Sequence, residues 1–132
     1  MKFILMMHAK KGPITGYSES GEWNLTRWPP GTFDQHMAAH HALNAELTKS
    51  GELVSINALA EPREAKIVKA GAQKSPITDG VFPETKEFLA GWWIVEVKNA
   101  ERAYEIAARA SAAPGPDGKP LNMEIEVRQV MG

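Results

Sequence analysis

Two short stretches of the chain are apolar at almost every position, a pattern typical of strands that are covered on both faces. The first predicted strand runs from Lys2 to Ala9. The second predicted strand is the last part of the segment Thr78–Val97. Its alternating positions are Trp93, Val95 and Val97 on one side, and Trp92 and Ile94 on the other. Because successive side chains of a strand point to opposite faces, we expect both strands in the centre of a sheet.

Two further stretches alternate between apolar and polar residues. They are Glu52–Leu59 and Met123–Val130. This alternation is typical of strands at the edge of a sheet or exposed on one face. Between the second and third main strands, Ala65–Lys69 and Ser75–Thr78 flank a small turn-like segment, which predicts an accessory hairpin.

Helical periodicity predicts two helices. The first spans Thr32 to Ser50, with Thr32 and Gln35 in the spacing of a capping box and Gly51 as the residue that ends it. One of its faces collects Phe33, His36, Met37, His40, Leu43, Asn44 and Leu47. The second helix follows Asn99 and runs to about Ala112, with a buried stripe of Ala103, Ile106, Ala107 and Ala110.

Composition narrows the possible functions. The 132 residues carry a formal charge of −1 and no basic run, so nothing in the charge favours nucleic acid or an anionic membrane as a partner. The chain has no cysteine, which excludes disulfides and thiol catalysis. Its opening apolar run is too short for a signal sequence or a membrane span. We expect one soluble, cytoplasmic domain over residues 1–132.

The segment before the third main strand resembles a known signature. Thr78-Asp-Gly-Val-Phe-Pro-Glu-Thr-Lys-Glu87, followed by Ala90-Gly91 and an aromatic strand, is similar to the motif of YCII-related proteins of the DGPF type. Val81 stands where the motif has proline, and Ala90 where it often has glycine. The resemblance extends to the opening strand, to His40 eleven residues before Gly51, and to the closing Glu126-Val-Arg128.

The resemblance implies a bacterial protein with an α+β, ferredoxin-like βαββαβ fold, sheet order 4-1-3-2, which dimerises into an α+β barrel. The two strands that are apolar on both faces are the first and third, and these are central in that order. Both helices would cover one face of the sheet. The other face then needs a cover, and we expect a homodimer to supply it.

The candidate catalytic residues are His40 and Asp79. His40 lies in the middle of the apolar helix face, matches the family's histidine position, and suits proton transfer near neutral pH. Asp79 would orient it or act as a separate acid. The alternatives are a core histidine bonded to a backbone carbonyl, and a turn aspartate bonded to its own backbone.

Other residues are candidates for binding substrate. Trp28, in the long loop Lys10–Gly31, could close over a pocket or simply pin the loop to the core. His36 shares the helix face of His40, and their spacing could also hold a metal ion, although we expect none. The remaining candidates are Glu84 and Lys86, which could equally be solvated surface charges, and Arg128, which could bind an anionic substrate or pair with Glu124 or Glu126.

Two functions are compatible with these residues. The first is an acid–base enzyme acting on a small organic molecule in a pocket of the dimer, with His40 as base. The second is a ligand-binding or regulatory module of the same fold, without catalysis. Neither needs a cofactor, and the sequence leaves open whether the protein is an enzyme, and its reaction and substrate.

Overall fold

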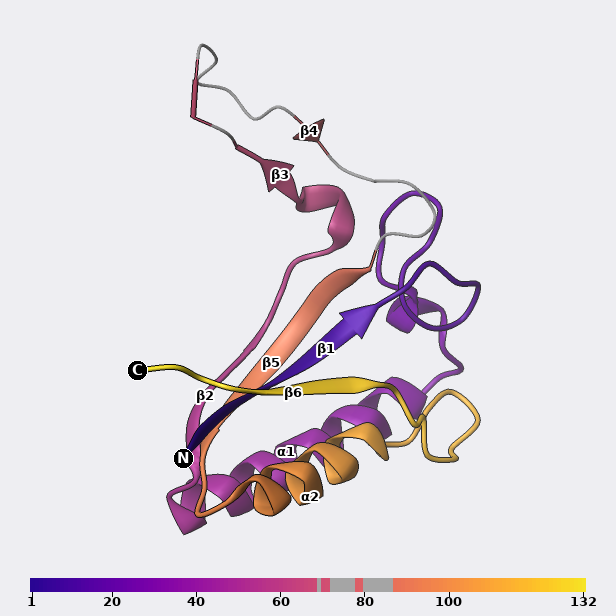
Figure 1. The fold of residues 1–132 in the computed structure, drawn as a ribbon. Helices are drawn as coiled ribbons and strands as arrows, with labels where there is room; N and C mark the ends of the chain where they lie inside the picture. Colours follow the sequence, from indigo (N-terminus) through magenta and orange to yellow (C-terminus); the bar gives the residue numbers. More distant parts are fainter. Residues whose placement is uncertain (69, 72–77, 80–86) are drawn as a thin grey trace.

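Four strands form one antiparallel sheet, and two helices cover one of its faces (Figure 1). The structure, a computed structural model, describes residues 1–68, 70–71, 78–79 and 87–132. The main elements are β1 (Lys2–Ala9), α1 (Thr32–Ser50), β2 (Leu53–Ala58), β5 (Phe88–Glu96), α2 (Ala100–Ser111) and β6 (Ile125–Gln129). Two shorter strands, β3 (Lys66–Ile67) and β4 (Thr78–Asp79), pair with each other in a separate hairpin.

The order of strands in the main sheet is β2-β5-β1-β6. Counting the four main strands along the chain, this is 2-3-1-4, which is 4-1-3-2 from the opposite edge. The two strands that are apolar on both faces, β1 and β5, are therefore central. Their register places Leu5 opposite Trp93 and Met6 opposite Trp92. The fold is the α+β, ferredoxin-like arrangement that the pattern predicted.

The core lies between the sheet and the two helices. On the sheet side, Phe3 and Leu5 of β1 and Trp93 and Val95 of β5 are buried, which shows which of the two alternating sets faces the helices. The helices contribute leucines from α1 and small residues from α2, which let the helix approach the sheet closely. The members of this core are Phe3, Leu5, Leu43, Leu47, Trp93, Val95, Val97, Ala103, Ile106, Ala107 and Ala110.

The helix ends differ from expectation at one point. Thr32 is not the N-cap of α1, because Gly31, with φ of +83°, occupies that position and no side chain caps the helix. The Thr32 hydroxyl instead donates to the Pro29 carbonyl at 2.6 Å. The capping-box prediction is therefore wrong, whereas Gly51 (φ +79°) ends α1 as predicted, and Asn99 Oδ1 accepts the Arg102 N–H at 3.0 Å.

The edge strand β2 leaves no room for a side chain on β5 at Gly91. A Cβ atom at this position would lie 2.7 Å from the carbonyl oxygen of Asn57 and 3.1 Å from the end of the Met7 side chain. Real Cβ atoms do not come that close to a backbone oxygen. Glycine at position 91 is therefore required by the approach of the neighbouring strand.

The loop between β1 and α1 is held by a buried polar residue. Asn24, fully buried in a short 3₁₀ turn (Asn24–Arg27), donates from its amide to the carbonyls of Gly12 at 2.6 Å and Thr15 at 2.9 Å. Trp28 is buried and donates its indole N–H to the Ile14 carbonyl at 2.9 Å. These bonds fold the loop over the end of the sheet where β1 stops.

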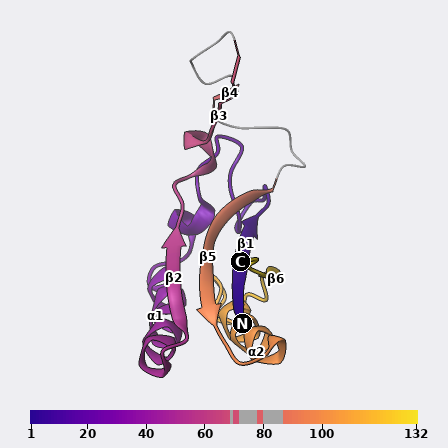
Figure 2. The same cartoon turned by 60° about the vertical axis from the view of Figure 1, so that its left-hand side comes forward.

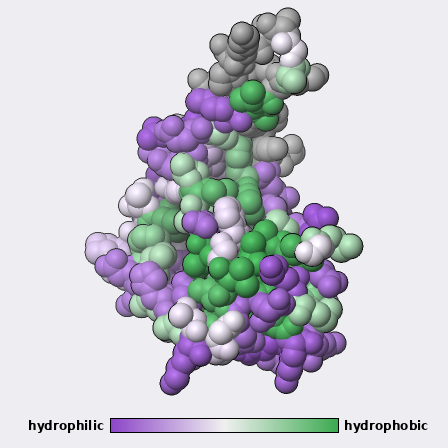
Figure 3. Space-filling model, turned by 90° about the vertical axis from the view of Figure 1, so that its left-hand side faces the viewer, coloured by the Kyte–Doolittle hydropathy of each residue, from purple (hydrophilic) through white to green (hydrophobic). Residues whose placement is uncertain are grey.

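The second face of the sheet is not covered by either helix (Figure 2). The alternate positions of the central strands, Ile4 and Met6 on β1 and Trp92 and Ile94 on β5, lie there and are only half-buried. Figure 3 shows hydrophobic side chains gathered on this side of the molecule. The β3–β4 hairpin extends beyond the end of the sheet and away from the helices in both ribbon views.

Within the part of the chain that the structure describes, neither helix has the length and apolar character needed to cross a membrane.

Candidate functional site

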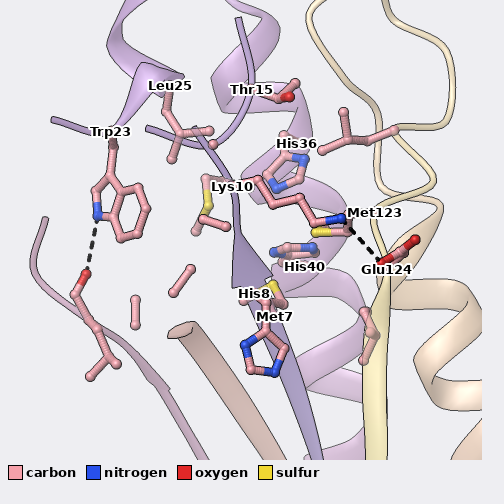
Figure 4. A pocket seen from close by; sticks show the side chains of 18 of the residues that line it. Met7, His8, Lys10, Thr15, Trp23, Leu25, His36, His40, Met123 and Glu124 are labelled. Carbon is pink, nitrogen blue, oxygen red and sulfur yellow. Dashed lines mark hydrogen bonds and ion pairs between the residues drawn. The ribbon is translucent and has the colours of Figure 1, made fainter. Parts of the chain in front are cut away.

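A cavity of about 1340 Å³ opens at the end of the sheet where β1 stops and α1 begins (Figure 4). Its walls come from the end of β1, the loop after it, the first half of α1, the end of β2 and the segment before β6. Two histidines of α1, His36 and His40, lie in its wall. The folding of the loop by Asn24 and Trp28 therefore shapes one side of this cavity.

His36 is buried, with 6% of its surface exposed. Its Nδ1 donates to the Pro114 carbonyl at 2.9 Å, and Trp28 meets the ring edge to face at a centroid distance of 5.4 Å. Burial lowers the pKa of His36, and the bond to Pro114 only partly opposes this. The imidazole is therefore neutral at pH 7.

His40 is held in a similar way one helical turn later. Its Nε2 lies 3.4 Å from the Ala110 carbonyl, and its ring centroid is 4.4 Å from that of His36. Burial, and then repulsion from His36, lowers the pKa of His40 from 6.5 to about 4. The hydrogen bond to Ala110 raises the pKa of His40, but by less than burial and the repulsion from His36 lower it. His40 is neutral at pH 7 and its tautomer is set by a backbone carbonyl.

Asn44 continues the row of polar side chains along α1 and also lines the cavity. Its Oδ1 accepts the indole N–H of Trp93 at 2.7 Å. Trp93 in turn meets the His40 ring edge to face at 5.2 Å. The central strand β5 thus positions both His40 and Asn44.

The other predicted site residues are dispersed. Trp28 lines the cavity beside His36. Asp79 pairs through β4 with Lys66 in the hairpin, which lies away from α1, so one chain does not bring it beside His40. Arg128 is exposed on β6, with its Nε 3.7 Å from Glu126. Glu84 and Lys86 lie outside the described residues.

One polar pair in the cavity wall was not expected as a site. His8 Nε2 lies 3.0 Å from the Glu126 carboxylate, and both residues line the cavity. No spacing in the sequence brings these two residues together. Their proximity depends on the β1–β6 register, which pairs Met6 with Glu126 and places His8 diagonally across.

The spacing of His36 and His40 on α1 raises the question of a further metal ligand nearby. Among the described residues, no group of three or more histidine, aspartate or glutamate side chains is arranged to hold an ion. His36 and His40 supply two nitrogens, and structural metal sites usually need four ligands.

The fold and this cavity define a ferredoxin-like α+β protein with a buried pair of histidines in the wall of a pocket. The family model of the YCII-related domain matches residues 1–115. The chain therefore belongs to the YCII-related family. A search of curated proteins found no match to it.

Proposed function

We propose that this protein binds a small organic molecule in the cavity and that His40 acts on it as a general base. The observation that carries the proposal is the state of His40: buried, neutral at pH 7, and held by one nitrogen while its ring lines a cavity. A neutral imidazole with one unprotonated nitrogen can accept a proton from a bound molecule.

A backbone carbonyl holds the His40 imidazole in place, and burial makes it a weak base. In a histidine–carboxylate pair the carboxylate sets the tautomer of the imidazole, and here the Ala110 carbonyl sets it instead. A carbonyl does not neutralise an imidazolium as a carboxylate does. With a pKa near 4, His40 is a weak base, so it suits substrates whose proton is already acidic.

The cavity walls favour a flat, largely apolar ligand. Aromatic rings of Trp28, Phe33 and Trp93 and the methionines Met7, Met37 and Met123 line the space around the two imidazoles. Pockets for small molecules commonly combine such walls with a few fixed polar groups.

A homodimer is part of this proposal. The uncovered face of the sheet carries half-buried apolar side chains from both central strands, and a second copy packed on it would bury them. Asp79 lies on the β3–β4 hairpin, away from α1 in one chain, and a second copy packed on the sheet could supply it to His40.

The alternative is a module that binds the same ligand without changing it, with His40 as a structural residue. Its bond to Ala110 and its contact with Trp93 favour this reading equally. The two functions differ in what happens to the bound molecule.

Ligand carried through purification and identified by mass spectrometry provides the substrate for the test. With that molecule, His40→Gln should lower turnover by roughly 10²–10⁴-fold while the fold persists, because glutamine cannot act as a base near pH 7. The control is Lys49→Gln, since Lys49 is exposed at the far end of the same helix and does not line the cavity. Unchanged turnover in folded His40→Gln would remove the catalytic role, and binding without turnover in the native protein would favour the module.

A further inference from the structure

Three polar side chains stand at intervals of four residues along the cavity side of α1. They are His36, His40 and Asn44. Residues four apart on a helix lie on one face with a rise of about 6 Å. The three side chains therefore form a row that a single elongated molecule could contact.

The ring N–H of each histidine in the row already donates to a backbone carbonyl. A carbonyl oxygen can only accept, so the ring atom bonded to it must carry the proton. His36 thus donates through Nδ1 to Pro114, and His40 through Nε2 to Ala110. In a neutral imidazole the second nitrogen is then a bare acceptor, which leaves His36 Nε2 and His40 Nδ1 without a donor.

These two acceptors are not sealed inside the protein. Among the described residues, the fully buried side-chain nitrogen and oxygen atoms that lack a partner are Asn24 Oδ1 and Trp92 Nε1. The free nitrogens of His36 and His40 are not among them. Because both rings line the cavity, it is from the cavity that these nitrogens are reached.

Asn44 presents a hydrogen-bond donor rather than an acceptor. An indole N–H only donates, so the amide oxygen of Asn44 must face Trp93, and its Nδ2 group points elsewhere. The indole N–H groups nearest the row are also occupied, since Trp93 donates to Asn44 and Trp28 donates to Ile14. The row therefore offers acceptor, acceptor and donor in sequence.

From these donor and acceptor assignments we infer that the ligand is an uncharged planar molecule. It presents N–H or O–H donors to His36 and His40 and an acceptor to Asn44. This inference rests on the proposed function, because it names the class of molecule that the same cavity takes. A carboxylate or phosphate at the histidines would face two lone pairs, and the ammonium groups of the cavity wall are already in ion pairs, Lys10 with Glu124 at 4.0 Å and Lys11 with Glu19 at 2.9 Å. Buried acceptors that stay unmatched are costly, so the row selects against anions.

Three probes built on the same substituted benzene ring separate these possibilities. They are meta-aminobenzamide, which has donors, an acceptor and no charge; its fully N-methylated analogue, which has no donors; and meta-aminobenzoate, which is an anion. Each is titrated into the ¹⁵N-labelled full-length protein, with EDTA present to exclude stray metal ions. The histidine ring-nitrogen signals are followed by NMR.

We expect meta-aminobenzamide to bind at least about tenfold more tightly than the other two, the effect of one unmatched polar group. Its binding should shift the signals of the unprotonated nitrogens of His36 and His40. If meta-aminobenzoate binds as well, or if only other cavity residues respond, the cavity is real but the inference is wrong. If no probe perturbs any residue of the cavity, both the inference and the proposed function fail.

Substitution of Asn44 tests the third position. Asn44→Asp keeps the oxygen that accepts from Trp93 but replaces the donor by a charged acceptor, so binding of meta-aminobenzamide should fall by about tenfold. Asn57→Asp is the matched control, because it adds the same charge to the cavity wall on β2, away from the row. An equal loss in both variants would show a general charge effect and would overturn the role of Asn44.

Discussion

The indole N–H of Trp93 donates to Oδ1 of Asn44 across 2.7 Å, which joins a central strand to the cavity side of α1. Trp93 has only 1% of its surface exposed, so water cannot replace this acceptor. The same indole packs edge to face against His40. One hydrogen bond therefore fixes the position of a core tryptophan, a cavity amide and the candidate base.

Removing the amide should destabilise the protein. Asn44→Leu leaves the Trp93 N–H buried and unpaired, which costs about 1–3 kcal/mol. Urea unfolding followed by tryptophan fluorescence measures the change. Asn44→Asp keeps an acceptor and should lose less stability than Asn44→Leu. Equal losses in the two variants would show that the bond to Trp93 contributes little.

The fold was largely predictable because its signal is local. Alternation separated Trp93 and Val95 from Trp92 and Ile94 and placed β1 and β5 in the centre of the sheet, but only the structure shows that Trp93 and Val95 face the helices. The N-terminus of α1 was predicted wrongly, because the Thr32 and Gln35 spacing ignores that Gly31 can adopt a positive φ and end the preceding turn.

The site was less predictable because its contacts are not local. His40 could be placed on the correct helix face, but its anchor Ala110 is seventy residues away at the end of α2. Likewise, His8 and Glu126 meet only through the strand register, which no spacing in the sequence reveals. Tertiary structure therefore determines the protonation and the tautomer of the imidazoles.

The pH dependence of stability should report the burial of His40. Its pKa in the folded protein is about 4, below the 6.5 of an exposed histidine. Below pH 6.5 the unfolded chain therefore binds a proton that the folded chain refuses, and stability falls until about pH 4. The total loss from this residue is about 3 kcal/mol, and above pH 6.5 its contribution is constant. His36 acts in the same direction.

Comparison with a variant isolates this effect from that of the carboxylates. His40→Gln has no imidazole at position 40, so its free energy of unfolding should fall less steeply between pH 6.5 and pH 4 than that of the native protein. Urea titrations at several pH values in this range provide both curves. Parallel curves would mean that His40 takes up its proton as readily in the folded protein as in the unfolded chain.

Position 91 should not tolerate a side chain. In Gly91→Ala the new Cβ would lie 2.7 Å from the Asn57 carbonyl oxygen, so β2 must move away from β5. Overpacking of this kind typically costs about 1–3 kcal/mol. The thermal midpoint should fall, and because Asn57 lines the cavity, ligand binding should weaken as well. An unchanged midpoint would show that the edge strand shifts at no cost.

The proposed dimer predicts the mass of the protein in solution and the surface through which two copies associate. The uncovered face of the sheet exposes parts of Ile4, Met6, Trp92 and Ile94, and the Trp92 indole nitrogen is buried there without an acceptor among the described residues. At about 25 cal/mol per Å² of apolar area, covering these side chains favours association before its entropy cost is subtracted. Light scattering at micromolar concentration should give twice the 14.5 kDa of the chain.

A charge on this face should then dissociate the pair. Trp92→Arg places a cation in the centre of the proposed interface, where a two-fold axis would bring it close to its own copy. Tyr104→Arg is the control, because Tyr104 is 55% exposed and lies on the helix side of the molecule. We expect a folded monomer from the first variant and a dimer from the second, with circular dichroism to confirm the fold. A native protein that is monomeric would contradict the dimer.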